Sequence, residues 1–220
     1  MLIKILRFIA SILFLPVCFA VTISFYEGIV AIKAISDLGI LFILGAFLYS
    51  SVHLLLFKFN FLYVLGHELM HAIATFLSGG KVKHIRVSSA GGSIGTTTPN
   101  IFVILAPYLI PGYTVFIAAL YFGLSFITDV TRYSNIFIFF TGFSLMFHLA
   151  YTADGIRKRQ SDLLKTGYLF SISFIYVVNL VIVFFVISFL FKEVSFLDFV
   201  TGACNRSKDF YYSFWRQLFQ

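Results

Sequence analysis

Long and nearly uninterrupted apolar stretches constrain this chain more than any other feature of its sequence. Six can be delimited, each close to the roughly 20 residues that carry a helix across a bilayer. They cover residues 8–26, 38–57, 60–78, 100–122, 134–156 and 167–191. Only 11% of the 220 residues are charged, whereas soluble domains carry roughly 25%. We therefore expect an all-α, polytopic membrane protein with about six transmembrane helices.

The first apolar stretch follows two basic residues, as it does in a signal sequence. Lys4 and Arg7 precede the segment from Phe8 to Phe25, and no strong small-residue cleavage site follows it. We expect an uncleaved signal anchor and an integral, multi-pass protein of a prokaryotic plasma or inner membrane. Residues 1–192 are expected to form a single transmembrane domain and residues 193–220 an interfacial C-terminal tail.

The net charge of +7 does not indicate a nucleic-acid partner. The basic residues lie in short stretches between apolar segments, where they would contact anionic lipid headgroups. With alternating spans, eight Lys and Arg fall on each side of the membrane. The orientation of the chain in the membrane therefore stays open, because the positive-inside rule needs an asymmetry.

Two connectors carry structural predictions. Only Lys58, Phe59 and Asn60 separate the second apolar segment from the third, which predicts a tight helical hairpin. The polar segment from Gly79 to Pro99 begins with the partly alternating, β-branched run KVKHIRV and continues with several glycines. This pattern is typical of a short β-hairpin.

The chemistry-bearing residues of the third apolar segment are His67, Glu68 and His71, in the sequence GHELMHA. Ionisable side chains at membrane depth cost several kcal/mol on most scales and usually mark a functional site. On a helix, residues i and i+4 share one face, so both histidines can direct a ring nitrogen at one ion. Glu68 is rotated from His67 by about 100°, which places it beside that ion.

This pattern is typical of a zinc-dependent peptidase. Neutral imidazole is a good zinc ligand, and zinc lowers the pKa of a bound water towards ~7. Glu68 would act as the general base that removes the proton and returns it to the departing amine. We expect His67 and His71 as zinc ligands and Glu68 as the catalytic residue.

The stretch GHELMHAIATFLSGGKVKHIRV resembles the signature of intramembrane metalloproteases of the site-2-protease type. The similarity covers about Tyr63 to Val87, and a weaker likeness continues to Asp162. It implies that the chain hydrolyses peptide bonds of membrane-associated proteins or peptides, with Zn²⁺ as cofactor and the bilayer as surroundings. It also implies a third zinc ligand, an Asp on a later span.

Two residues compete for the role of third ligand. Asp162, in QSDLLKTGYLFS, resembles the corresponding segment of shorter, divergent relatives and is favoured. Asp154 stands in an Asp-Gly pair, as in the usual motif of the family, but the Asn and Pro that normally precede that motif are absent. As alternatives, Asp162 would cap the last helix and Asp154 would be a solvated helix end. Asp129, beside Arg132, is expected to be a surface charge.

The remaining histidines leave other interpretations open. His148 either packs within its span or lines the site, and His84 is expected to be solvated. A b-type haem protein would use intramembrane histidines such as His53 as axial ligands. The main alternative is a non-proteolytic membrane metal-binding protein, a carrier or sensor that uses the same ligands. The strand from Lys81 to Val87 would either pair with an unwound substrate or form an ordinary interfacial loop.

Overall fold

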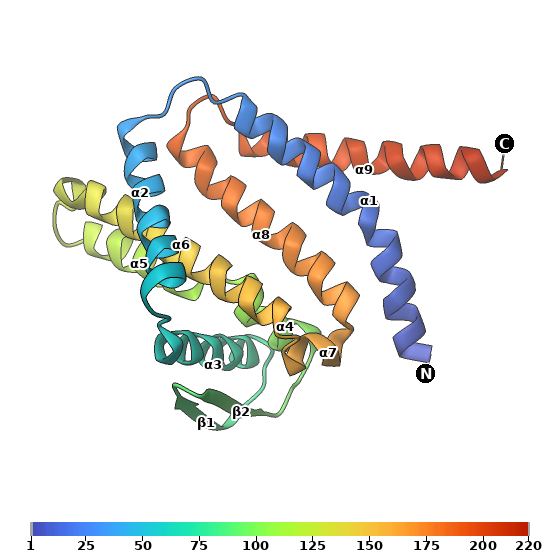
Figure 1. Ribbon diagram of the computed structural model, residues 1–220, viewed down its shortest axis with the longest axis horizontal. Helices are drawn as coiled ribbons and strands as arrows, with labels where there is room; N and C mark the ends of the chain where they lie inside the picture. The colour runs from blue at the N-terminus through green and yellow to red at the C-terminus, as the bar shows by residue number, and fades with distance from the viewer. Residues whose placement is uncertain (1, 220) are drawn as a thin grey trace. The chain divides into compact units, whose positions relative to one another are not determined.

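A computed structural model describes the backbone of residues 2–219 and the side chains of residues 5–217 and 219. It consists mainly of helices (Figure 1). The helices and strands, in chain order, are α1 (Leu2–Val30), α2 (Asp37–Ser51), the π-helical turn η1 (Val52–Leu56), α3 (Asn60–Leu77), β1 (Val82–Ser88), β2 (Gly91–Thr96), α4 (Ile101–Leu109), α5 (Gly112–Ser125), the 3₁₀ turn η2 (Thr131–Tyr133), α6 (Ser134–Arg157), α7 (Ser161–Thr166), α8 (Tyr168–Leu190) and α9 (Phe196–Phe219).

Among the described residues, four helical segments are long and apolar enough to cross a membrane. They are Ile5–Val30, Asp37–Leu56, Thr131–Arg157 and Tyr168–Leu190. The pair α4 and α5 makes a fifth if it counts as one span, although it bends by 72° at a short break. The third expected span is α3, whose polar motif residues lower its mean hydropathy. A mostly helical membrane protein is therefore supported, whereas the expected number of six spans is not confirmed.

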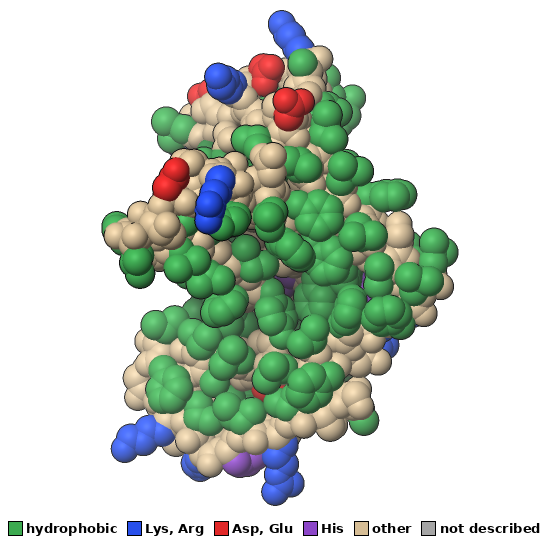
Figure 2. Space-filling model, turned by 90° about the vertical axis from the view of Figure 1, so that its left-hand side faces the viewer, with side chains coloured by type: hydrophobic (Ala, Val, Ile, Leu, Met, Phe, Trp, Pro, Cys, Tyr) green, Lys and Arg blue, Asp and Glu red, His purple; other side chains and the backbone are tan. Residues whose placement is uncertain are grey.

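The surface of the molecule fits this interpretation. Figure 2 shows a face on which hydrophobic side chains are numerous and charged side chains are few. Many of the largest apolar side chains are more than half exposed, among them Leu54, Leu55, Phe47 and Phe116. A soluble protein rarely exposes apolar area on this scale, whereas exposed apolar side chains are favourable in a protein that is surrounded by lipid.

The chain divides into two compact units, of which the first joins the two ends of the sequence. It contains residues up to Ser36 and from Leu164 onward, and in it α1 packs against α8 and α9. Arg206 of α9 donates to both carboxylate oxygens of Glu27 on α1, each at 2.6 Å. The amphipathic α9 occupies most of the expected C-terminal tail, and its place at the membrane interface stays a prediction.

The second unit, from Asp37 to Leu163, is built on the close pair α2 and α6. A Cβ added to Gly45 would collide with the carbonyl of Phe139, and one added to Gly142 with the carbonyl of Phe42. Only glycine permits backbones to approach this closely, which is how helices commonly pack in membranes. α6 of this pair packs in turn against α5.

The predicted helical hairpin of the second and third apolar segments is wrong. Within the described chain α2 packs along α6 rather than α3, and in Figure 1 α3 runs in a different direction from α2. The cause lies in the connector, where η1 is followed by the extended residue Phe57. Lys58 then forms an ion pair with Asp154 near the end of α6, which ties the connector to α6.

The predicted β-hairpin after the motif helix is confirmed. Gly79 ends α3 in the left-handed region, with φ of 71°. The amides of Gly79 and Gly80 donate to the carbonyls of Phe76 and Thr75, the pattern of a Schellman cap. β1 and β2 then pair antiparallel with Ser88 opposite Gly91, and both strands contact α3 (Figure 1). Whether β1 binds a substrate stays a prediction.

Candidate metal centre

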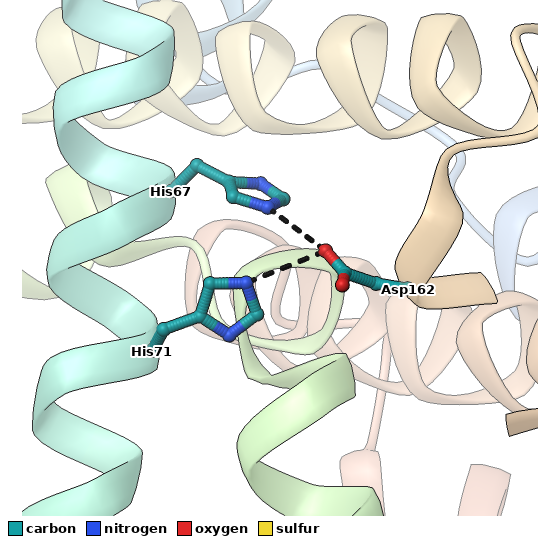
Figure 3. Close-up of side chains that lie close together, drawn as sticks. All are labelled: His67, His71 and Asp162. Atoms are coloured by element: carbon teal, nitrogen blue, oxygen red, sulfur yellow. Dashed lines mark ion pairs between the residues drawn. The ribbon is translucent and has the colours of Figure 1, made fainter. Parts of the chain in front are cut away.

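The helix α3 and the short helix α7 bring three of the four predicted site residues together. His67 and His71 project from one face of α3, one turn apart, towards Asp162 in the first turn of α7 (Figure 3). One donor atom from each residue lies within 4.8 Å of the donor atoms of the other two. These residues belong to one compact unit of the chain.

The spacing of the donor atoms is longer than that of a hydrogen bond and close to that of ligands on a zinc ion. Oδ2 of Asp162 lies 3.5 Å from Nε2 of His67 and 3.5 Å from Nε2 of His71. Hydrogen bonds of this kind are shorter, at about 2.7–3.2 Å. Two ligands on a tetrahedral zinc at about 2.0–2.1 Å are about 3.3–3.4 Å apart. Two imidazole nitrogens and a carboxylate oxygen at this spacing fit zinc.

His71 is oriented by the backbone carbonyl of Val103, which lacks its usual hydrogen-bond donor within α4. Its Nδ1 lies 2.7 Å from the carbonyl oxygen of Val103 in α4. Because a carbonyl only accepts, Nδ1 carries the proton and Nε2 offers its lone pair. In a regular helix the backbone amide four residues later would donate to the carbonyl of Val103. Here that position is Pro107, which has no N–H. The proline therefore leaves the oxygen available to His71.

His67 is held mainly by aromatic contacts. Its ring meets Tyr63 at a centroid distance of 5.4 Å and Tyr108 at 5.2 Å, both edge-on. Its Nδ1 is buried and has no hydrogen-bond partner among the described residues. The two tyrosines fix the plane of the ring, so that Nε2 points towards Asp162.

Asp162 is positioned by the turn between α6 and α7. Arg159 ends α6 in the left-handed region, with φ of 50°, which costs roughly 1–2 kcal/mol for a residue other than glycine. The next residue, Gln160, donates from Nε2 to the hydroxyl of Tyr63 at 3.1 Å and accepts from the hydroxyl of Tyr108. The tyrosines that contact His67 therefore also hold the segment that presents Asp162.

Glu68 is buried on the flank of α3 that faces the hairpin. A Cβ added to Gly92 of β2 would lie 2.6 Å from Oε1 of Glu68 and 2.7 Å from a methyl carbon of Val64. The strand therefore lies directly against the Glu68 side chain. The missing side chain at Gly92 leaves room for this carboxylate.

Asp154, the competing candidate for third ligand, lies in a different cluster. Its Oδ2 pairs with Lys58 and is 3.6 Å from Nε2 of His53. The other ring nitrogen of His53, Nδ1, is hydrogen-bonded to the hydroxyl of Tyr49 at 2.9 Å. Asp154 thus joins the end of α6 to the connector before α3, and the structure does not bring it to His67 and His71.

The other singled-out side chains lie outside the three-residue cluster. His148 of α6 is buried and lines an apolar cavity, and His84 is exposed on β1. Asp129 is exposed, and the hydroxyl and the amide of Thr131 donate to it. These hydrogen bonds lower the pKa of the Asp129 carboxyl, as expected for a surface charge. Asn100 caps α4 by accepting from the amide of Val103.

Comparisons of the chain with known protein families, with curated proteins and with solved structures gave no match.

Proposed function

We propose that this chain is a membrane-embedded, zinc-dependent endopeptidase of the site-2-protease type, acting on membrane-associated proteins or peptides. The observation that carries the proposal is the position of Asp162. Its Oδ2 is 3.5 Å from Nε2 of each motif histidine. A carboxylate equally spaced from two imidazoles of an HExxH helix is the donor set of a catalytic zinc, which usually keeps three protein ligands.

The roles follow from where each side chain lies. His67, His71 and Asp162 would hold the ion, which when bound lowers the pKa of water and polarises a peptide carbonyl. Glu68, buried on the adjacent flank, would take the proton from the attacking water and pass it to the departing amine. Val103 and Pro107 would keep His71 in the tautomer that binds metal.

The direct test is the metal content of the purified protein. We expect about one zinc per chain, the content of a mononuclear catalytic site. Stripping with a chelator should abolish cleavage of a peptide substrate, and one equivalent of Zn²⁺ should restore it. Atomic emission and cleavage are measured on the same samples. Undiminished hydrolysis by protein that contains no metal would contradict the proposal.

The arrangement of α4 gives a second expected result. In Pro107→Ala the new amide can donate to the carbonyl of Val103, within its own helix, and so competes with Nδ1 of His71. Loss of an outer-shell partner typically lowers metal affinity by about 10–100-fold. Because His71 would still share the carbonyl of Val103 with the new amide, the decrease in zinc affinity should lie at the lower end of that range. Chelator competition measures the affinity for zinc.

The stability of the metal-free protein separates this effect from general damage. Because Pro107→Ala restores a helical hydrogen bond, the metal-free variant should unfold at the same or a higher temperature than the original protein. Pro111→Ala, at the break after α4, is the matched control and should leave zinc affinity unchanged. If both variants lost affinity equally, or if Pro107→Ala kept full affinity, the assigned role of Val103 would be wrong.

A further inference from the structure

An apolar cavity of about 690 Å³ lies against the motif helix. Gly66, Met70 and Ile73 of α3 line it on one side, Phe116 and Ala119 of α5 on another, and His148 of α6 on a third. Its volume falls within the roughly 300–1,000 Å³ of typical ligand pockets. A cavity of roughly 150 Å³ already holds a benzene ring, so this one has room for several side chains.

The cavity begins at the metal centre and continues along one flank of α3. His67 belongs both to its lining and to the three-residue cluster. Around the axis of α3, the positions of Gly66 and Glu68 are each rotated by about 100° from His67, in opposite directions. Gly66 faces the cavity, whereas Glu68 faces β2. The candidate metal centre therefore lies between an apolar cavity on one side and the catalytic carboxylate with its hairpin on the other.

We infer that this cavity receives apolar residues of the substrate, such as Leu, Phe or Met, on one side of the bond that is cut. The inference rests on the proposed function. A peptide whose carbonyl lies at the metal centre has to continue in two directions from it. One direction leads to the hairpin and the other into the cavity. Because Phe116 and Ile73 are also exposed to the surroundings, apolar segments could enter from the bilayer.

The first test narrows the cavity. A mixture of synthetic peptides of random sequence is incubated with the protein in detergent micelles, and the cut sites are located by mass spectrometry. The original protein should prefer large apolar residues on one side of the cut only. Ala119→Trp, which fills the cavity, should lower cleavage beside Leu, Phe and Met by about tenfold or more, while cleavage beside Ala and Ser stays within about twofold.

The neighbouring position provides a matched control. Leu120 is half exposed and does not line the cavity, so Leu120→Trp should leave the pattern of cut sites unchanged. An unchanged pattern in Ala119→Trp, or a preference of equal strength on both sides of the cut, would overturn the inference. If the original protein shows no cleavage that depends on Glu68, the proposed function fails instead.

A second test detects the occupant without catalysis. A photo-crosslinking phenylalanine analogue is placed at position 116 in the Glu68→Gln protein, and a peptide rich in Leu and Ala serves as the probe. We expect the probe peptide to be captured from position 116 and not from position 120. Capture of phospholipid alone, with no peptide, would identify the cavity as a lipid site and overturn the inference.

Discussion

Glu68→Gln is expected to reduce peptide hydrolysis by about 10²–10⁴-fold while the protein keeps its zinc. General acid–base catalysis typically contributes a factor of this size. Glutamine has nearly the shape of glutamate, so the packing of this side chain against Gly92 should be retained. Because an amide cannot accept and return the proton, only the proton transfer is removed.

The measurement compares zinc content, thermal unfolding and cleavage rate in the same preparations. Glu193→Gln serves as the control, because Glu193 is exposed in the connector between α8 and α9, and its rate should be unchanged. This experiment also separates the two classes of function. A metal carrier or sensor would keep its function in Glu68→Gln and lose it in His67→Ala. Full hydrolytic activity in Glu68→Gln would exclude the proposed mechanism.

Asp162→Ala should weaken metal binding, whereas Asp154→Ala should leave it unchanged. Asp162→Ala removes one of three ligands, so zinc affinity should fall by more than the roughly 100-fold that outer-shell changes reach. Asp154→Ala should keep zinc. It should instead lower the unfolding temperature, because Lys58 and His53 lose the carboxylate with which they pair. Lys58 is exposed, and exposed ion pairs contribute about 0–1 kcal/mol, so the decrease should be small.

Chelator competition and thermal unfolding of both variants check this pair of expectations. Asp129→Ala is the surface control, since Asp129 is exposed, and it should leave zinc affinity unchanged. A reversal, in which Asp154→Ala releases the metal and Asp162→Ala retains it, would show that the third ligand had been assigned to the wrong residue.

Local patterns in the sequence predicted those parts of the site that lie on one helix. The i, i+4 spacing places His67 and His71 on one face, and the β-branched run followed by glycines predicted the hairpin. The choice between Asp162 and Asp154 needed the fold. Asp154 lies at the end of the fifth apolar segment and Asp162 eight residues later. In the structure Asp154 pairs with Lys58, whereas Asp162 lies beside the two histidines.

Other features could not be predicted because they depend on contacts between distant segments. The tyrosines that hold Gln160 come from α3 and α4, and no pattern in either helix marks them. The segment 100–122 was expected to be one span, but the chain bends by 72° between α4 and α5. Pro111 and Gly112 at that break were the available signal. Pro107 likewise signalled that the carbonyl of Val103 lacks its usual helical donor.

The separation of the donors along the chain has a consequence for biosynthesis. His67 and His71 leave the ribosome early, whereas Asp162, the residue that completes the cluster with them, is made about ninety residues later. A growing chain that has displayed only the two histidines offers two of the three donors. In the proposed peptidase the metal centre would therefore stay incomplete until residue 162 has been made and folding has brought Asp162 beside the two histidines.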